Sequence, residues 1–294
     1  MCDMKFNAVL MLFVVICTLR NLHAARILAV FQHNAESNFI MFETLLKALA
    51  ARGHDVVVVS HFPQHSPVKN YTDISISGSS IRFNNSLNIS VVEKDDNVLL
   101  PFLIIRNSVE TCKMVLEHRN IETLLKSEEK FDLIINEIFG SDCFLGFVHK
   151  FKAPHISLMT SVPLPWSNER TANPDNPAHV QNYCAQYTDR MTFWERLQNT
   201  VQTEMIKWVY YYFSELPTHR IARKYFGDDL PALSDIARNV SLVLVNSHFS
   251  VNYPRPTVPV VVEVGGLHIQ SASKLPQDIQ TLLDEAPQGV IYFS

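Results

Sequence analysis

Short runs of β-branched apolar residues recur along this chain, and helical patterns lie between them. The clearest run is Asp55–Ser60 (DVVVVS), whose four consecutive valines favour a strand buried on both faces. A similar run, Arg26–Phe31 (RILAVF), precedes it. Strands that alternate with helices in this way form βαβ units, in which the strands are parallel. The sequence therefore predicts an α/β fold built on a parallel sheet.

The stretch between these two runs has the pattern of an amphipathic helix. Within Asn38–Arg52, the apolar residues at helical spacing are Phe39, Phe42, Leu45, Leu46 and Leu49. We expect Ser37 to cap the start of this helix and Gly53 to follow its end. Residues 64–98 are polar, which predicts an exposed irregular or hairpin excursion.

The same patterns continue through the rest of the chain. The predicted elements are a helix at Ser108–Ser127, a strand at Phe131–Asn136, a helix near Cys143–Phe151, a strand at His155–Met159, a loop at Ser161–Pro177, a helical region at Arg190–Phe226 broken at Pro217, and strands at Ser241–Asn246 and Val260–Val264. A loop as long as Ser161–Pro177 is usually functional or mobile.

Several common site types are excluded by the motifs that the chain lacks. Its 8 glycines form neither a dinucleotide fingerprint nor a P-loop, and there is no G-x-S-x-G or H-E-x-x-H string. His61 and His65 are separated by Pro63, so a helical zinc face is not expected, and we predict surface loop histidines and no metal. A net charge of −4 gives no reason to expect nucleic acid as a partner.

The first 24 residues have the pattern of a secretory signal peptide. Lys5 precedes the apolar run Ala8–Leu19, which is too short to cross a bilayer. Leu99–Ile105 is interrupted by Pro101 and is not expected to span a membrane. Glycosylation sequons occur at Asn70, Asn84, Asn88 and Asn239. We therefore expect the secretory pathway, in the lumen of the endoplasmic reticulum, and a glycoprotein.

Three cysteines follow the signal, namely Cys112, Cys143 and Cys184. They have no C-x-x-C spacing, so the chain is not a disulfide scaffold. The alternatives are one bridge or three buried free thiols, of which the second is the more ordinary.

Strings along nearly the whole chain resemble insect-type UDP-glycosyltransferases. The matching strings, in order, are FETLLKALAARGHDVVVVSHFP, NYTDISI, FDLIINEIFGSDCFLGFVHKFKAPHI, DRMTFWERL and VEVGGLHI. The resemblance implies a GT-B fold with two Rossmann-like halves, each a parallel sheet with helices on both faces. In such enzymes the N-terminal half binds the acceptor and the C-terminal half binds the UDP-sugar.

This resemblance also implies a division of the chain. Residues 25–270 correspond to the acceptor-binding domain, and residues 271–294 to the linker and first strand of a donor domain that is otherwise missing. Docking of residues 289–294 onto the N-terminal sheet is the alternative. The co-substrate of the full-length enzyme would be a UDP-sugar such as UDP-glucose, with no bound cofactor and no metal. The acceptors implied are small lipophilic molecules, of the detoxification or hormone-conjugation type.

The catalytic base of the family is a histidine shortly after the first strand, and this sequence departs from it. The family position falls on Asn38, whose amide can orient a hydroxyl group but cannot accept its proton near neutral pH. His33 matches a different family histidine, which shapes the loop, and is a weak candidate for a substitute base.

The carboxylate that supports the base has two candidates. Glu137 lies at the end of a predicted strand, where ligands of parallel sheets bind, and Asp142 matches the DCF string of insect relatives. Capping of the helix near Cys143–Phe151 is the alternative role of Asp142.

We predict an acceptor site lined by Phe31, Phe39, Met159, Trp208 and Tyr211. The aromatic run that contains Trp208 and Tyr211 has two other interpretations, helix-core packing and contact with a membrane interface. We expect a transferase half that is inactive alone. The alternative is a non-catalytic module that binds lipophiles, or that serves as a partner of full-length relatives in a homo- or hetero-oligomer.

Overall fold

A computed structural model describes residues 24–80, 99–269 and 272–292. A single seven-stranded sheet in the order β3-β2-β1-β4-β5-β6-β7 forms its centre, and each neighbouring pair of strands is parallel. The strands are β1 (Arg26–Val30), β2 (Asp55–Ser60), β3 (Tyr71–Ser75), β4 (Leu133–Glu137), β5 (His155–Met159), β6 (Leu242–Val245) and β7 (Val261–Glu263). The predicted signal peptide and the sequons at Asn84 and Asn88 lie outside the described residues.

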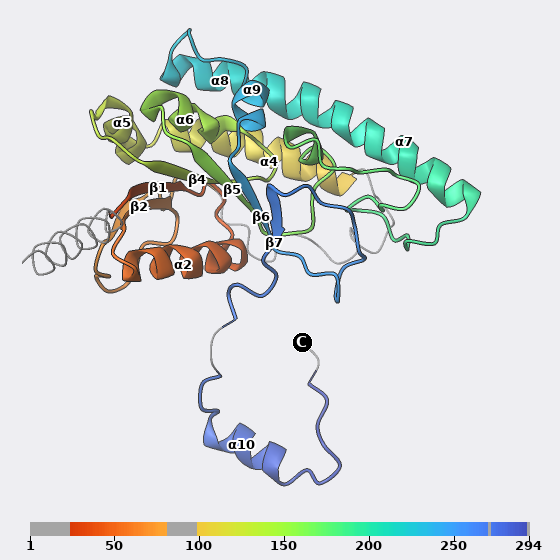
Figure 1. Cartoon of the computed structure of the whole chain (residues 1–294). Coiled ribbons are helices and arrows are strands. Elements are labelled where there is room, and N and C mark those ends of the chain that lie inside the picture. Colours follow the sequence, from red (N-terminus) through yellow and green to blue (C-terminus); the bar gives the residue numbers. More distant parts are fainter. Residues whose placement is uncertain (1–23, 81–98, 270–271, 293–294) are drawn as a thin grey trace, which may run out of the picture.

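Helices cover both faces of the sheet, as Figure 1 shows. The helices of the described residues are α2 (Glu36–Ala51), α4 (Leu99–Leu116), α5 (Arg119–Lys126), α6 (Gly146–Phe151), α7 (Phe193–Tyr210), α8 (Leu216–Phe226), α9 (Leu233–Arg238) and α10 (Gln277–Asp284), with short 3-10 turns at Cys143–Leu145 and Asn168–Arg170. Of these, α10 lies away from the sheet. Helix α2 lies on one face, and α4, α5, α6 and α8 lie on the other. This arrangement confirms the Rossmann-like α/β fold.

Alternate residues of β1 enter two separate cores, which explains why its sequence is apolar throughout. Leu28 belongs to the core with α4 and α5, whereas Ile27 and Ala29 belong to the core with α2. Successive side chains of a strand point to opposite faces, so a strand covered on both faces must be apolar at every position.

The order of the strands places a topological switch point between β1 and β4. The chain leaves β1 for β2 and β3 on one side, then returns to add β4 on the other side of β1. The loops that follow β1 and β4 therefore diverge at the same edge of the sheet. Ligands of open α/β sheets bind at such switch points.

Two predictions about the region around β2 are wrong for identifiable reasons. Helix α2 begins at Glu36 with Ala35 as its N-cap residue, so Ser37 lies inside the first turn. The polar stretch that suggested an irregular or hairpin excursion contains β3, which pairs parallel to β2. Its partly exposed position at the edge of the sheet explains its polar sequence.

The predicted helix at Ser108–Ser127 is two helices, and the first of them begins earlier. Helix α4 starts at Leu99 and tolerates Pro101, because this proline lies in the first turn, where a missing N–H costs no hydrogen bond. Pro217 does not break the later helical region. A π-helical turn at Tyr211–Glu215 precedes α8 and accommodates the proline at the start of that helix.

Gly53 follows α2 in the left-handed region, with φ of 96°, as the sequence predicts. Two cysteines form a disulfide, Cys112 of α4 with Cys143, so the prediction of three free thiols is wrong. Cys184 is the free thiol of the described part.

Of the residues assigned to the linker and donor strand, those that the structure describes, 272–292, lie outside the sheet. Helix α10 buries none of its residues, and the described residues 289–292 form no strand. The assignment of residues 271–294 stays a prediction. In the described part, no helix is long and apolar enough to cross a membrane.

Candidate functional site

The switch point brings together the polar residues that follow β1, the start of α2 and the end of β4. Glu137 is the last residue of β4, and its side chain is 2 % exposed. Asn38, in the first turns of α2, donates from Nδ2 to Glu137 Oε1 at 3.4 Å. The two residues that the resemblance assigns to the base position and to its carboxylate are therefore in contact.

The carboxyl group of Glu137 is surrounded by neutral groups. Burial raises its pKa to about 8, and the hydrogen bond from Asn38 opposes that shift only in part. A buried carboxyl group without a cation favours its protonated form, because the ionised form loses hydration without compensation. Glu137 therefore holds its proton at neutral pH.

His33 lies on the other side of the same carboxyl group. Its Nε2 is 3.9 Å from Glu137 Oε2 and 3.2 Å from the amide nitrogen of Gln32. The edge of the ring packs against Phe139, with 4.6 Å between ring centroids. Burial, with a smaller effect of His61, lowers the pKa of His33 to about 3. The pair is thus a neutral imidazole beside a neutral acid, which makes His33 a weak base.

His61 is buried, although the sequence predicted a surface loop. Its Nε2 is 3.1 Å from the carbonyl oxygen of Gln32 and 3.0 Å from the hydroxyl of Ser80. Burial lowers its pKa to about 4. Because His61 directly follows β2, it reaches the same edge of the sheet as the loop after β1 and connects the two loops.

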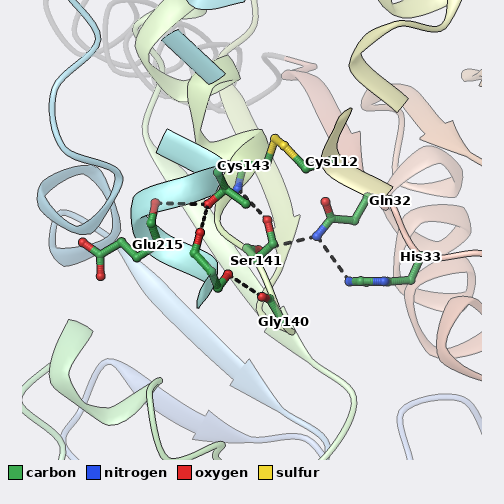
Figure 2. The surroundings of a disulfide bond; sticks show 9 residues. Gln32, His33, Cys112, Gly140, Ser141, Cys143 and Glu215 are labelled. Atoms are coloured by element: carbon green, nitrogen blue, oxygen red, sulfur yellow. Dashed lines mark hydrogen bonds between the residues drawn. A yellow bond between two sulfur atoms is a disulfide. The ribbon is translucent and has the colours of Figure 1, made fainter. Parts of the chain in front are cut away.

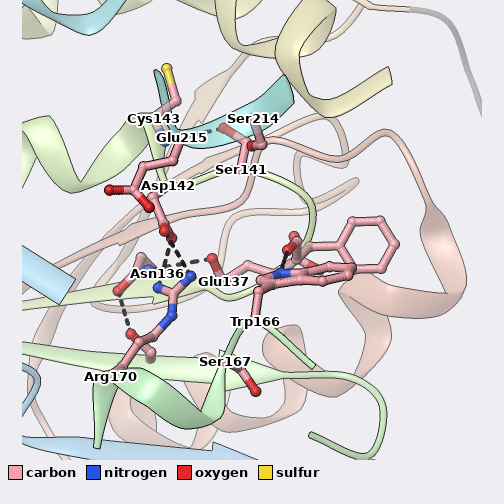
Figure 3. Close-up of polar contacts among 12 residues, drawn as sticks. Asn136, Glu137, Ser141, Asp142, Cys143, Trp166, Ser167, Arg170, Ser214 and Glu215 are labelled. Atoms are coloured by element: carbon pink, nitrogen blue, oxygen red, sulfur yellow. Dashed lines mark hydrogen bonds and ion pairs between the residues drawn. The ribbon is translucent and has the colours of Figure 1, made fainter. Parts of the chain in front are cut away.

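Asp142 belongs to a different cluster, in which it forms an ion pair with Arg170 (Figure 3), although Arg170 Nε is buried without a hydrogen-bond partner among the described residues. Its Oδ1 is 2.6 Å from Arg170 Nη1, and its Oδ2 accepts from Arg170 Nη2 at 2.7 Å and from Tyr210 at 2.8 Å. Burial lowers the pKa of Arg170, but the charge of Asp142 and the hydrogen bonds outweigh it and raise that pKa above its ordinary value.

This cluster gives Asp142 partners that neither of its two sequence-based interpretations predicted. Its side chain makes no capping hydrogen bond to the short helix at Cys143–Leu145 in the described structure. Both of its oxygens are occupied by Arg170 and Tyr210. Arg170 was not predicted, because a single arginine in a loop rich in proline and asparagine has no periodic signal. Tyr210 belongs to the aromatic run that contains Trp208 and Tyr211, but the sequence did not connect it with Asp142.

The loop between Glu137 and Asp142 is held from several sides. The hydroxyl of Ser214, in the π-helical turn, donates to the carbonyl oxygen of Gly140 at 2.6 Å. A Cβ atom on Gly140 would lie 2.3 Å from the Ser108 hydroxyl oxygen, so the close approach of α4 requires glycine. The disulfide anchors the residue after Asp142 to the same helix (Figure 2).

The residues predicted to line the acceptor site are dispersed. Phe31 and Met159 are buried in two different cores, and the ring of Phe31 stacks on Phe42. Trp208 is 60 % exposed and Tyr211 is 39 % exposed. Tyr211 borders a cavity of about 90 Å³ beside the Asp142 cluster. Phe39 alone of the five lines a large cavity.

That cavity has a volume of about 590 Å³ and lies where β1 and β2 end and α2 begins. Its walls combine two stacked phenylalanine rings with polar and acidic side chains. The lining residues are Asn34, Glu36, Phe39, Ile40, Glu43, His61, Phe62, Pro63, Gln64, His65 and Ser77. Its volume lies within the ordinary range for small-molecule sites.

A second cavity, of about 470 Å³, lies where β5 and β6 end. Between residues 24 and 292, leaving out 81–98 and 270–271, no group of three or more histidine, cysteine or acidic side chains could hold a metal ion.

Comparison with known proteins identifies related sequences. Residues 26–294 match the family described as "UDP-glucoronosyl and UDP-glucosyl transferase". "UDP-glucosyltransferase 2" of Dactylopius coccus is 37% identical over 97% of this chain and 55% of its own length. "2-hydroxyacylsphingosine 1-beta-galactosyltransferase" of Rattus norvegicus is 30% identical over 90% of this chain and 49% of its own. The chain thus spans about half the length of these relatives.

Among solved structures, a glycosyltransferase of Arabidopsis thaliana in complex with UDP-L-rhamnose is similar at 13% identity, with a TM-score of 0.43. The similarity covers 90% of this chain and 55% of that one.

Proposed function

Because the chain belongs to the UDP-glucoronosyl and UDP-glucosyl transferase family, we propose that it is the acceptor-binding part of an enzyme that transfers a hexose from a UDP-sugar to small lipophilic molecules. UDP-glucose is the donor we favour, since the most similar relative described above is a UDP-glucosyltransferase. The single observation that carries the proposal is the contact between Asn38 and Glu137 at the switch point.

In the proposed reaction the acceptor nucleophile attacks the anomeric carbon, and UDP leaves. An alcohol needs a base to share its proton during this attack. Asn38 can orient the hydroxyl group but cannot take the proton, and Glu137 is protonated below its pKa of about 8. We expect transfer to alcohols to be weak at neutral pH and to rise as the pH passes 8.

Amine acceptors should suffer less from this arrangement. A neutral amine attacks through its free electron pair and loses its proton only afterwards. The chain alone should not turn over, because we assign the donor contacts to the other half of the relatives. The activity test therefore uses a chimera with the donor half of the Dactylopius coccus relative.

The test compares a phenol with the matching aniline as acceptors for this chimera. Asn38→His places an imidazole beside Glu137, and we expect transfer to the phenol to rise by about 100-fold, the lower range for a positioned base. The aniline should gain much less. Ser37→His, one residue away and exposed, is the matched control. Equal gains with both acceptors, or no gain with the phenol, would contradict the assignment.

A second candidate function is non-catalytic binding of lipophiles, alone or as a partner of full-length relatives. The neutral Asn38–Glu137 pair and the 590 Å³ cavity with its two phenylalanine rings favour it. The chain without any donor half would then bind an apolar fluorescent ligand saturably. A chimera that transfers hexose at rates typical of its relatives would reject this alternative.

We also propose that the protein lies in the lumen of the endoplasmic reticulum, against the membrane surface. Large apolar side chains at helical spacing are exposed along α7 and the turn after it. They are Trp194, Leu197, Val201, Met205, Trp208 and Tyr212. Aromatic rings of this kind favour membrane interfaces. Co-sedimentation with lipid vesicles should fall in Trp208→Ser; unchanged binding would reject the contact.

Glycosylation of the sequons provides a direct test of the lumenal location. The sequon asparagines Asn70 and Asn239 are both exposed. Glycosidase treatment of the protein from insect cells should therefore increase its electrophoretic mobility, and no change would count against a lumenal location.

A further inference from the structure

The 470 Å³ cavity beside the carboxyl ends of β5 and β6 has a chemical character of its own. Ser161 follows β5 and Asn246 follows β6, so the cavity lies at the edge where the parallel strands end, which is also the edge of Glu137. Three tyrosines, Tyr183, Tyr187 and Tyr253, line it together with amide side chains. Arg255 is the one charged residue among its lining residues.

The guanidinium of Arg255 has a donor without a hydrogen-bond acceptor in the described part of the chain. Its Nε is buried and has no hydrogen-bond acceptor among the described residues. Burial lowers the pKa of Arg255, and the charge of Glu263 opposes this only in part. Glu263 is itself exposed, so water screens its attraction. A buried donor left unpaired is costly, which makes a ligand acceptor favourable there.

Other polar side chains of the same cavity are already satisfied within the protein. Tyr187 donates its hydroxyl to Gln198 at 2.9 Å, and Asn182 donates to Thr203 at 3.3 Å. Asn252 donates to the Ser247 hydroxyl at 3.2 Å. Among the described lining residues, the buried side-chain atom without a partner is Nε of Arg255, and the tyrosine rings beside it offer flat apolar surface.

The 590 Å³ cavity at the other end of the same edge is lined differently. Glu36 and Glu43 line it, and no lysine or arginine is among its lining residues in the described chain, although Lys47 pairs with Glu43 at 2.9 Å. The lining therefore offers an anionic group no cation at this end of the edge, whereas Arg255 offers one at the other. Such a difference orients a charged ligand in one direction.

We propose that the cavity around Arg255 binds the oxyanion group of an aromatic acceptor, a carboxylate, sulfate or phosphate, and so selects anionic aromatic acceptors. This inference rests on the proposed function, since it names the acceptor class for the same transfer. The β1–β4 gap and the β5–β6 gap are two strand spacings apart, and two spacings amount to about 10 Å. The acceptor would carry its nucleophile at about that distance from its oxyanion.

Two fluorescent probes with the same rings test the charge requirement. 1-Anilinonaphthalene-8-sulfonate carries an oxyanion, and N-phenyl-1-naphthylamine does not. In Arg255→Met we expect the sulfonate probe to bind at least about tenfold more weakly, while the neutral probe is unchanged. Arg255→Lys should keep most of the sulfonate affinity. Equal changes for both probes, or none for the sulfonate, would overturn the proposal.

The matched control is Arg220→Met, which removes an exposed arginine from α8 and should leave both probes unaffected. Unchanged binding of the neutral probe also reports that the variants are folded. A measurement without variants provides a further check. In the unmodified chain, 2-naphthoate should displace the sulfonate probe at about tenfold lower concentration than 2-naphthamide, and equal potency would overturn the proposal.

The diphosphate of the donor is the other possible source of an oxyanion at Arg255. Competition with UDP distinguishes it from the acceptor. If UDP displaces the sulfonate probe and Arg255→Met weakens UDP binding equally, Arg255 serves the donor and the acceptor assignment is overturned. If UDP has no effect, the assignment stands. All these measurements use the chain without a donor half, so an inactive chimera would contradict the proposed function and leave the binding result intact.

Discussion

Glu137 and Asp142 lie five residues apart after the same strand, and their surroundings are opposite. Glu137 faces the amide of Asn38 and the neutral ring of His33, and burial raises its pKa to about 8. Asp142 forms a two-pronged ion pair with Arg170 and accepts a hydrogen bond from Tyr210. Both carboxyl groups are buried, so burial alone does not set their behaviour.

From this difference we propose that Asp142 is a structural carboxylate and that Glu137 is the reactive group. Asp142 connects the loop after β4 to the loop that carries Arg170 and to α7, and it has no free oxygen for a substrate. Among the described residues no cation is paired with Glu137, which lies at the switch point, where ligands of such sheets bind. We therefore assign the chemistry to Glu137 and the clamping of the loop to Asp142.

The largest expected effect follows from removing the cation of the Asp142 cluster. Arg170→Met leaves a buried carboxylate unpaired, which should lower the free energy of unfolding by about 3–5 kcal/mol. Urea denaturation of the purified protein measures it. The double variant Asp142→Asn with Arg170→Met should recover much of this loss, because neither charge remains. A loss below about 1 kcal/mol in the single variant would show that Asp142 is not a clamp.

The disulfide beside Asp142 should contribute almost as much. Cys112 and Cys143 are 31 residues apart, and closing a loop of that length stabilises a protein by about 3–4 kcal/mol. The double variant Cys112→Ser with Cys143→Ser should lose that amount in the same denaturation experiment. Cys184→Ser, which removes the free thiol, is the control and should change stability little. Equal losses of stability in the double variant and in the control would show that the disulfide does not stabilise the fold.

Glu137 should produce a smaller, pH-dependent effect. Its folded pKa of about 8 exceeds its ordinary value of 4.5, so its stabilising contribution is present below pH 4.5 and is lost as the pH rises through 8. Glu137→Gln mimics the protonated acid and cannot ionise. Between pH 6.5 and 7.5, the variant should gain about 1 kcal/mol relative to the unmodified protein.

His33 acts in the opposite direction, because its folded pKa of about 3 lies below its ordinary value of 6.5. Its contribution is lost as the pH falls from 6.5 towards 3. The comparison of Glu137→Gln with the unmodified protein cancels this term, since both contain His33. A stability difference that does not vary with pH would mean that Glu137 is ionised throughout.

The parts of the fold that the sequence predicts are those with a strong local signal. The valine run became β2 with the expected bounds, and His155–Met159 became β5. Both strands are buried, so their composition reports their environment directly. Strand β3 was missed because an edge strand tolerates polar residues, and its pairing with β2 is a long-range property.

The site was predictable only in part, for the same reason. The position of Glu137 at a strand end indicated a reactive carboxyl group, and its contact with Asn38 agrees. The partners of Asp142 come from residues 170 and 210, which share no sequence pattern with it. The pairing of Cys112 with Cys143 likewise depends on how α4 packs beside the loop.

The central claim, that Glu137 is a neutral acid in the folded protein, can be tested by titrating its carboxyl carbon. Glutamate labelled with carbon-13 gives one signal for each residue by NMR, and the signal absent in Glu137→Gln identifies the group. We predict a titration midpoint near pH 8. A midpoint near the ordinary value of 4.5 would contradict the claim, because Glu137 would then be a carboxylate at neutral pH.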